Sequence, residues 1–298
     1  MSERHILLAV LTALIWGFNF VIIKVGLDSF PPFLFSALRF LSASIPAVFF
    51  IDRAKIPWRV IVTVGVVLGV IKYSLLFLGM KVGMPAGLSS LAIQSQVLFT
   101  LLLSAVFLKD TPSSVQKAGI TLALGGIGLI AYSRSGDVSV VGFVLVIGAA
   151  IAWSAANILI KRAGGFDPFR LMVWMSLIPP LPMLLLSFLF EKGQMEALSK
   201  LELRGVGAVL YTGIIATVVA FGIWGWLLRT YSATLVTPFA LLVPVFGMMF
   251  SALVLGEQQS AVGILAAGLV LMGLGTIVFG PRVVTMIALR EAPSAPKE

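Results

Sequence analysis

Cysteine is absent from the 298 residues of this chain, and histidine occurs once, as His5. Without cysteine the chain has no disulfide bond, thiol nucleophile, zinc–thiolate site or iron–sulfur cluster. His5 alone supplies neither a histidine-based metal cluster nor a Ser-His-Asp triad, unless the terminus folds inward. We therefore expect no metal ion, no cofactor and no enzyme activity.

Charged residues are also scarce, at 11% of the sequence, against about 25% in a typical soluble domain. Apolar residues make up 59%, and the mean hydropathy is +1.09. These values exclude a water-soluble globule, and they exclude intrinsic disorder, which requires low hydrophobicity and high charge. The net charge of +9 does not indicate nucleic-acid binding, because the basic residues lie in short segments between apolar runs.

Long apolar runs are abundant and extend along nearly the whole chain. A membrane-spanning helix needs about 20 mostly apolar residues. Ten runs meet this length, at 5–26, 32–51, 57–80, 85–108, 113–133, 139–161, 168–190, 204–228, 232–255 and 260–281. No signal-peptide cleavage site follows the first run, so it predicts a retained helix. The sequence predicts an all-α integral membrane protein with ten transmembrane helices, and a short surface helix fits the connection 191–204.

Lysine and arginine are distributed unevenly between the two predicted sides of the membrane. With the N-terminus inside, thirteen of the 21 fall in inner segments and six in outer segments. Because cytoplasmic loops carry the excess of positive charge, both termini are expected in the cytoplasm. The remaining two, Arg39 and Lys72, lie inside predicted spans.

The two halves of the sequence resemble each other. Residues 13–26 compare with 150–163, where Trp16 matches Trp153 at a shift of 137, and later positions match at a shift of 147. The predicted domains are a first five-helix repeat (1–135), a second, inverted five-helix repeat (136–281) and a disordered cytoplasmic tail (282–298). Because five is an odd number, the second copy enters the membrane from the opposite side. Inverted repeats are typical of transporters with a central cavity between the halves.

Two Trp–Asn pairs lie near the middle of equivalent helices, Trp16 with Asn19 and Trp153 with Asn157. Residues three or four apart share one helix face. Polar groups at this depth tend to face a cavity or a partner helix. The pairs therefore predict either the lining of a central substrate site or asparagines that hold helices together, and their recurrence in both halves favours the substrate site.

Further candidate site residues are Lys72, Tyr73, Gln94 and Tyr211. Lys72 lies about 10 Å deep in its helix. It either contacts an anionic substrate group or extends its ammonium outward to the membrane surface. Arg39, at a similar depth, is expected to be structural.

Prolines and acidic residues complete the pattern. Pro238 and Pro244 free backbone carbonyls and predict a hinge in the ninth helix. All twelve acidic residues fall in a terminus, a loop or a helix end, whereas a proton relay or sodium site normally needs a carboxylate inside a span. Asp110 and Glu257 occupy equivalent positions just before helices, where an anion favours the helix dipole.

Three stretches carry a resemblance to the drug/metabolite transporter superfamily, in its ten-helix EamA branch. They are Ala-Leu-Ile-Trp-Gly-Phe-Asn at 13–19, Leu-Arg-Phe at 38–40, and Leu-Gly-Glu-Gln-Gln-Ser-Ala-Val-Gly-Ile-Leu-Ala-Ala-Gly at 255–268. The Trp16/Trp153 pair, Tyr73 and the lack of a buried acid make the chain most similar to the YddG-type amino acid exporters of the bacterial inner membrane.

The resemblance implies export of amino acids, often aromatic, and related metabolites across the inner membrane. Without a carboxylate carrier, the simplest mechanism is alternating-access uniport by a monomer. The alternatives are a transporter of another neutral metabolite or of a nucleotide-sugar, and a proton-coupled drug/metabolite antiporter, for which Lys72 is the one candidate proton carrier. The small multidrug relatives carry a glutamate in their first helix, and its absence here argues against cationic drugs.

Overall fold

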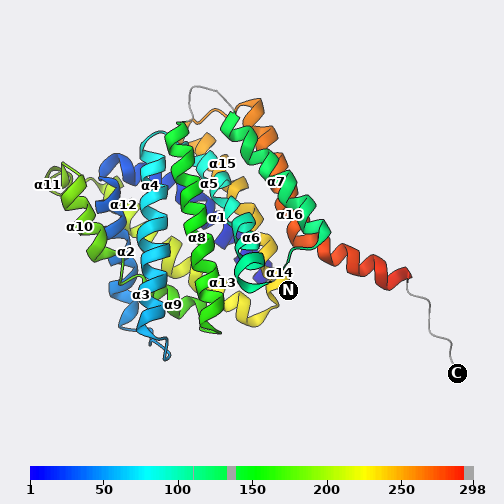
Figure 1. Cartoon of the computed structure of the whole chain (residues 1–298). Coiled ribbons are helices and arrows are strands. Elements are labelled where there is room, and N and C mark those ends of the chain that lie inside the picture. The colour runs from blue at the N-terminus through cyan, green and yellow to red at the C-terminus, as the bar shows by residue number, and fades with distance from the viewer. Residues whose placement is uncertain (110, 133–138, 292–298) are drawn as a thin grey trace.

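The computed structural model describes residues 1–109, 111–132 and 139–291, and the residues that it describes form helices and no strands (Figure 1). In chain order the helical segments are α1 (Glu3–Ser29), α2 (Pro32–Val48), α3 (Trp58–Val64), η1 (Gly65–Lys72), α4 (Tyr73–Lys81), α5 (Ala86–Ala92), η2 (Ile93–Ser95), α6 (Gln96–Leu108), α7 (Ser114–Tyr132), α8 (Val140–Ala163), α9 (Pro168–Met175), α10 (Pro180–Phe190), α11 (Gln194–Ser199), α12 (Leu203–Leu210), η3 (Tyr211–Val219), α13 (Ala220–Thr230), α14 (Ala233–Val236), η4 (Thr237–Leu241), α15 (Leu242–Leu255) and α16 (Ala261–Glu291).

Eight continuous helical stretches in the described part of the chain are long and apolar enough to cross a membrane. Two further apolar helices, Pro32–Val48 and Ser114–Ile130, are shorter. Each of these ten stretches overlaps one of the ten predicted runs, although length and composition alone support eight. The number of ten spans therefore stays a prediction.

One connection and the C-terminal segment can be compared directly with the sequence-based predictions. The surface helix expected within 191–204 is present as α11. The last helix was expected to end at residue 281, but α16 continues through Pro281 to Glu291. A proline inside a helix removes one hydrogen bond without necessarily ending the helix, so residues 282–291 of the expected disordered tail are helical. Residues 292–298 lie outside the described residues.

Four of the membrane-length helices contain segments with non-α geometry, and these occur in two pairs. The stretch α3–η1–α4 contains the π-helical segment η1, and α12–η3–α13 contains the π-helical segment η3. The stretch α5–η2–α6 contains the 3₁₀ turn η2, and the helix ending in α15 is preceded by the 3₁₀ segment η4. Such irregular turns are uncommon and frequently mark functional sites.

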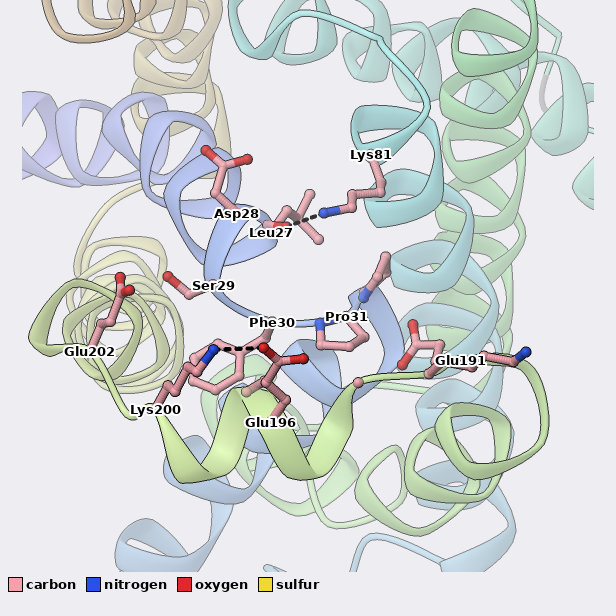
Figure 2. A pocket seen from close by; sticks show the side chains of 14 residues that line it. Leu27, Asp28, Ser29, Phe30, Pro31, Lys81, Glu191, Glu196, Lys200 and Glu202 are labelled. Atoms are coloured by element: carbon pink, nitrogen blue, oxygen red, sulfur yellow. Dashed lines mark hydrogen bonds and ion pairs between the residues drawn. The ribbon is translucent and has the colours of Figure 1, made fainter.

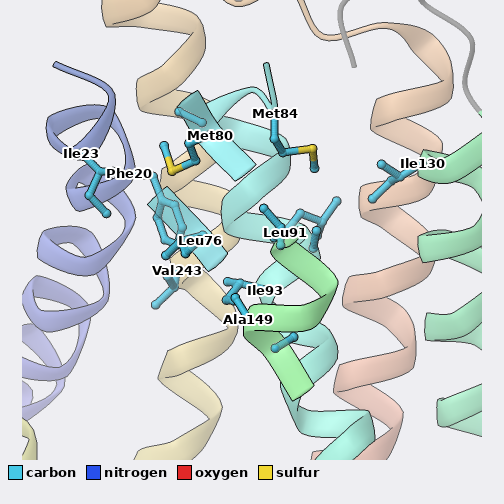
Figure 3. Packing of buried hydrophobic residues seen from close by; sticks show 14 of the residues in the cluster. Phe20, Ile23, Leu76, Met80, Met84, Leu91, Ile93, Ile130, Ala149 and Val243 are labelled. Atoms are coloured by element: carbon cyan, nitrogen blue, oxygen red, sulfur yellow. The ribbon is translucent and has the colours of Figure 1, made fainter. Parts of the chain in front are cut away.

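Side chains from many helices form one extended apolar core. Phe20 and Ile23 of α1 pack with Leu76 of α4, Leu91 of α5 and Val243 of α15 (Figure 3). In Figure 1, α7 and α16 lie against each other at one side of the bundle. Gly119 and Gly273 allow their backbones to approach, since a Cβ on either would collide with the other's carbonyl oxygen. The helices α7 and α16 thus form a closely packed pair at the side of the bundle that the other helices make.

Candidate functional site

Lys72, the last residue of η1, is buried inside the bundle with 4% of its surface exposed. Its Nζ lies 3.4 Å from the ring centroid of Tyr73 and 4.6 Å from that of Trp153 on α8. An ammonium group over aromatic faces is stabilised by the ring quadrupoles, most strongly when it is desolvated. Three of the residues predicted for the site, Lys72, Tyr73 and Trp153, thus form one contact group.

Arg39 of α2 reaches the same tyrosine and is only 2% exposed. Its Cζ lies 4.1 Å from the Tyr73 ring centroid. Its Nη2 donates hydrogen bonds to Thr217 Oγ1 at 2.9 Å and to the carbonyl oxygen of Thr212 at 3.3 Å, both on η3. Its Nε and Nη1 are buried without a hydrogen-bond partner. The guanidinium is therefore anchored at one nitrogen and unsatisfied at the other two.

Two cations thus share one aromatic ring without a protein anion beside them. In the described part of the chain every Asp and Glu lies in a connection, at a helix end or on the surface helix α11. Because Arg39 Cζ and Lys72 Nζ lie 4.1 and 3.4 Å from the same ring centroid, they are at most 7.5 Å apart, and two unit charges within that distance repel by at least about 2 kcal/mol at an effective dielectric constant of about 20. This arrangement is electrostatically suited to an added anionic group.

A second contact group lies on η3 and the adjoining α13. The Trp16 Nε1 donates to the carbonyl oxygen of Ala216 at 3.0 Å, and its ring packs on Phe221 and Trp224. The Tyr211 hydroxyl donates to the carbonyl oxygen of Ile15 at 3.0 Å. Trp16 and Tyr211 therefore lie where α1 meets η3.

Asn19 is on the same face of α1 as Trp16, and its Oδ1 is buried without a partner. The structure shows no direct contact between Trp16 and Trp153 among the described residues. The two groups are instead linked through η3, which receives Trp16 at Ala216 and Arg39 at Thr217. Arg39 then contacts Tyr73, beside Lys72 and Trp153.

Two predicted residues are placed apart from this linked set. The Asn157 Nδ2 donates to Gln96 Oε1 at 3.0 Å and to Thr100 Oγ1 at 3.1 Å, so its amide joins α8 to α6. This is the helix-packing alternative raised by the sequence. Gln94 is 7% exposed within η2 and makes no side-chain hydrogen bond with a described residue.

The two prolines expected at a hinge lie at the interruption of the ninth helix. Pro238 is the second residue of η4, and Pro244 is buried near the start of α15. A proline near the beginning of a helical segment removes an N–H that would be unsatisfied there in any case. The helix is interrupted where the sequence indicated, while movement about that point stays a prediction.

Carboxylates at one end of the bundle cap helices that belong to the other half of the chain. Glu257 accepts hydrogen bonds from the N–H groups of Ala86 and Gly87, at 2.7 and 3.0 Å. Glu191 accepts in the same way from Phe33 and Leu34, at 2.7 and 3.2 Å. The sequence placed Glu257 on the helix that follows it, and the structure corrects this to α5. Asp110 lies outside the described residues.

A cavity of about 480 Å³ lies away from the two contact groups, between the end of α1, the start of α2 and the surface helix α11 (Figure 2). Lys81 extends toward it and donates to the carbonyl oxygen of Leu27 at 2.6 Å, and Lys200 pairs with Glu196 at 2.7 Å. No group of His, Asp and Glu suited to a metal ion occurs in the described part of the chain. The predicted central cavity between the halves is not established by this pocket.

Arg39 contacts the predicted site residue Tyr73, and the sequence did not indicate this contact. A signal for a buried charge was present, because Arg39 lies mid-span with no acid within the same helix. The interhelical information was missing, since only the folded chain brings η3 and Tyr73 to the guanidinium.

Comparisons with known proteins agree on a transporter. The model of the EamA-like transporter family matches residues 4–132 and again residues 140–279. A protein of Salmonella typhimurium named probable amino-acid metabolite efflux pump is 39% identical over 95% of this chain and 97% of its own length. A protein of Escherichia coli with the same name is 36% identical over the same shares.

More distant proteins share the same overall architecture. An uncharacterized transporter of Bacillus subtilis, YoaV, is 26% identical over 88% of this chain and 92% of its own length. A solved crystal structure with 20% identity covers 98% of this chain and 100% of its own, with a TM-score of 0.66. At that identity the likeness establishes the fold alone.

Proposed function

The chain belongs to the EamA-like transporter family, and from this premise we propose that it exports amino acids, including aromatic ones, and related small metabolites. The relatives named as amino-acid metabolite efflux pumps support this substrate class. The observation that carries it is the buried group of Lys72, Tyr73 and Trp153. It offers a cation for a carboxylate and aromatic faces for an apolar side chain.

The proposed mechanism is alternating access in the bacterial inner membrane. Ten spans form two inverted halves, roughly residues 1–135 and 136–281, which rock about a site between them. The monomer is the transporting unit, and hinge movement occurs at Pro238 and Pro244. Trp16, Asn19 and Tyr211 complete the site on the side of the linked contact group described above. Gln94 lines the site from η2, apart from that group, and Asn157 maintains the packing of α8 on α6.

The same residues weigh against two of the other candidate substrates, whereas a nucleotide-sugar has to be distinguished by the transport assay. A nucleotide-sugar carries two phosphate charges, which Lys72 and Arg39, the buried cations of the described spans, match in number. A cationic drug meets two positive charges and no described intramembrane carboxylate. A neutral metabolite without a carboxylate leaves both cations uncompensated. An amino acid supplies one carboxylate together with the apolar group that the aromatic rings accommodate.

Counterflow in proteoliposomes tests the substrate class. Vesicles loaded with unlabelled phenylalanine, leucine, alanine or uridine diphosphate glucose are diluted into the labelled compound. We expect transient accumulation of labelled phenylalanine, and none of the nucleotide-sugar. Accumulation of the nucleotide-sugar without any amino acid contradicts the proposal. Protein-free vesicles control for leakage.

A pH gradient tests uniport. With equal phenylalanine on both sides, uniport gives no net accumulation when a pH gradient is imposed. A Lys72→Met variant tests Lys72 as the proton carrier, because Lys72 is the buried amine of the described spans. Accumulation that survives this substitution and disappears with a proton ionophore demonstrates coupling through another residue.

Single cysteines test the orientation, since the chain has none of its own. Met195, on α11, is 80% exposed, and Ser114 at the start of α7 is exposed at the predicted cytoplasmic side. An impermeant thiol reagent added to whole cells is expected to label Met195→Cys and to spare Ser114→Cys. The reverse labelling contradicts cytoplasmic termini.

A further inference from the structure

Arg39 combines three properties that a merely structural arginine seldom has. It is 98% buried, its Nε and Nη1 have no hydrogen-bond partner, and no carboxylate accompanies it. The guanidinium stays charged at all accessible pH values. A buried charge with unsatisfied donors is unfavourable unless an anion completes it.

The fold holds this unsatisfied group in a fixed position. Thr217 Oγ1 accepts from Nη2, and Thr217 itself donates to the carbonyl oxygen of Thr212, five residues earlier in the π-helical segment η3. Gly213 lies against the backbone carbonyl of Arg39, where a Cβ would collide with it. Thr212, Gly213 and Thr217 therefore position Arg39. They leave its Nε and Nη1 without a hydrogen-bond partner.

Lys72 provides a second positive group at the same place. Arg39 Cζ and Lys72 Nζ lie 4.1 and 3.4 Å from one ring centroid, that of Tyr73. Their separation therefore cannot exceed these two distances added together. A carboxylate accepts charge-assisted hydrogen bonds of about 2.8 Å, and the Nε and Nη1 of Arg39 are unpartnered donors for it close to the Lys72 ammonium.

We propose that Arg39 and Lys72 together bind the carboxylate of the transported substrate, and that this carboxylate, rather than the ammonium, is the group that the protein requires. The inference rests on the proposed transport function and adds the recognition element. The ammonium of a zwitterion finds at most neutral acceptors such as the unpartnered Asn19 Oδ1. Full charges therefore recognise one end of the substrate and an uncharged amide the other.

The test compares ligands that each lack one charged group. Purified full-length protein in detergent is titrated with phenylalanine, with phenylalaninamide, which lacks the carboxylate, and with 3-phenylpropionate, which lacks the ammonium. Ligand-induced thermal stabilisation reports affinity, because a ligand that binds only the folded state raises its melting temperature. We expect 3-phenylpropionate to bind within about tenfold of phenylalanine and phenylalaninamide to bind at least about 100-fold more weakly.

Three variants assign the discrimination to Arg39. Arg39→Gln is expected to bring phenylalanine and phenylalaninamide to within about tenfold of each other, because the carboxylate then loses its guanidinium partner. Arg39→Lys retains a charge and part of the preference. Thr217→Val removes an anchor of Arg39 but not the guanidinium, so it lowers stability and keeps the preference for the carboxylate. Arg59→Gln, at an exposed position on α3, controls for loss of a positive charge.

Each outcome decides the proposal. Equal binding of phenylalanine and phenylalaninamide to the wild type overturns it, even if Arg39→Gln does not fold. An unchanged preference in folded Arg39→Gln also overturns it. Binding of 3-phenylpropionate without any amino acid supports the carboxylate site and contradicts the proposed amino acid export. Binding of none of the carboxylates contradicts both.

Discussion

The two halves of the chain share a frame but differ in charge. Each half matches the same family model, at residues 4–132 and 140–279. Each contains a π-helical segment, η1 or η3, followed by a helix with a 3₁₀ turn, η2 or η4. Irregular turns in both halves suggest that duplication preserved the points at which helices deviate from regular geometry.

The buried cations, in contrast, occur in the first half alone among the described spans. At a shift of 136 Arg39 corresponds to Met175, and at a shift of 147 Lys72 corresponds to Val219. Met175 is buried in an apolar cluster and Val219 is 40% exposed. In the proposed mechanism the duplicated frame supplies the movement, and the unduplicated charges give the proposed site a polar end and an apolar end.

Replacing Lys72 is expected to give the largest difference between the halves. Lys72→Met removes one charge-assisted contact and lowers phenylalanine counterflow by about 10- to 100-fold. Val219→Met, at the equivalent position of the second half, is expected to change it less than about twofold, since an exposed apolar residue is replaced by another of similar character. Equal effects of the two substitutions contradict an asymmetric site.

Two glycines within the π-helical segments, Gly65 of η1 and Gly213 of η3, give a smaller and partly symmetric effect. A Cβ at Gly65 meets Ile178 and the carbonyl oxygen of Met175, and one at Gly213 meets Ser42 and the carbonyl oxygen of Arg39. Each Gly→Ala change is expected to destabilise the protein by about 1–3 kcal/mol, measured by thermal unfolding in detergent.

Transport distinguishes these two glycine variants. Gly213→Ala shifts Arg39 and lowers counterflow, whereas Gly65→Ala shifts the apolar Met175 and leaves more activity per folded molecule. If Gly65→Ala is the less active protein after correction for the folded fraction, the position of Arg39 is not what limits transport.

The two tryptophans are expected to separate binding from stability. Trp16→Phe loses the hydrogen bond to the carbonyl oxygen of Ala216 and is expected to cost about 1 kcal/mol of stability. Trp153 has no such bond in the described structure, and its ring faces Lys72. Trp153→Phe keeps an aromatic face, so stability changes little and phenylalanine affinity falls by a few-fold. A larger stability loss for Trp153→Phe contradicts this assignment.

The sequence predicted what depends on local pattern. Apolar runs located the helices, and polar composition located the surface helix α11. Residues that share a helix turn, such as Lys72 and Tyr73, were also identified together. The contacts of Asn157 with Gln96 and Thr100 were not, because helical spacing limits which residues share a face but does not identify the neighbouring helix.

The roles of the charged residues were harder to predict, because they too depend on which helices are neighbours. Glu257 precedes α16 in sequence, but its carboxylate caps α5, which begins at Ala86. Arg39 was expected to be structural, and its contacts with Tyr73 of α4 and Thr217 of η3 could not be predicted because the sequence does not show which helices are neighbours. Composition shows that a buried charge needs a partner, and only tertiary structure shows whether the chain itself provides one.

The capping glutamates give the smallest expected effect and test whether charged caps join the two halves. Glu257 and Glu191, both of the second half, each hold two N–H groups at a helix start in the first half. Replacement by Gln keeps one acceptor oxygen but removes the charge that favours a helix N-terminus, at a cost of about 0.5–2 kcal/mol. Glu191 also accepts from Ser187 Oγ at 2.6 Å, so one of its oxygens is shared. We therefore expect Glu257→Gln to lower the melting temperature at least as much as Glu191→Gln.

A control at Glu196, which pairs with Lys200 on the surface of α11, is expected to change the melting temperature by less than either, because exposed ion pairs contribute little. If all three changes are equal, the caps do not join the halves, and the interface depends on apolar packing alone.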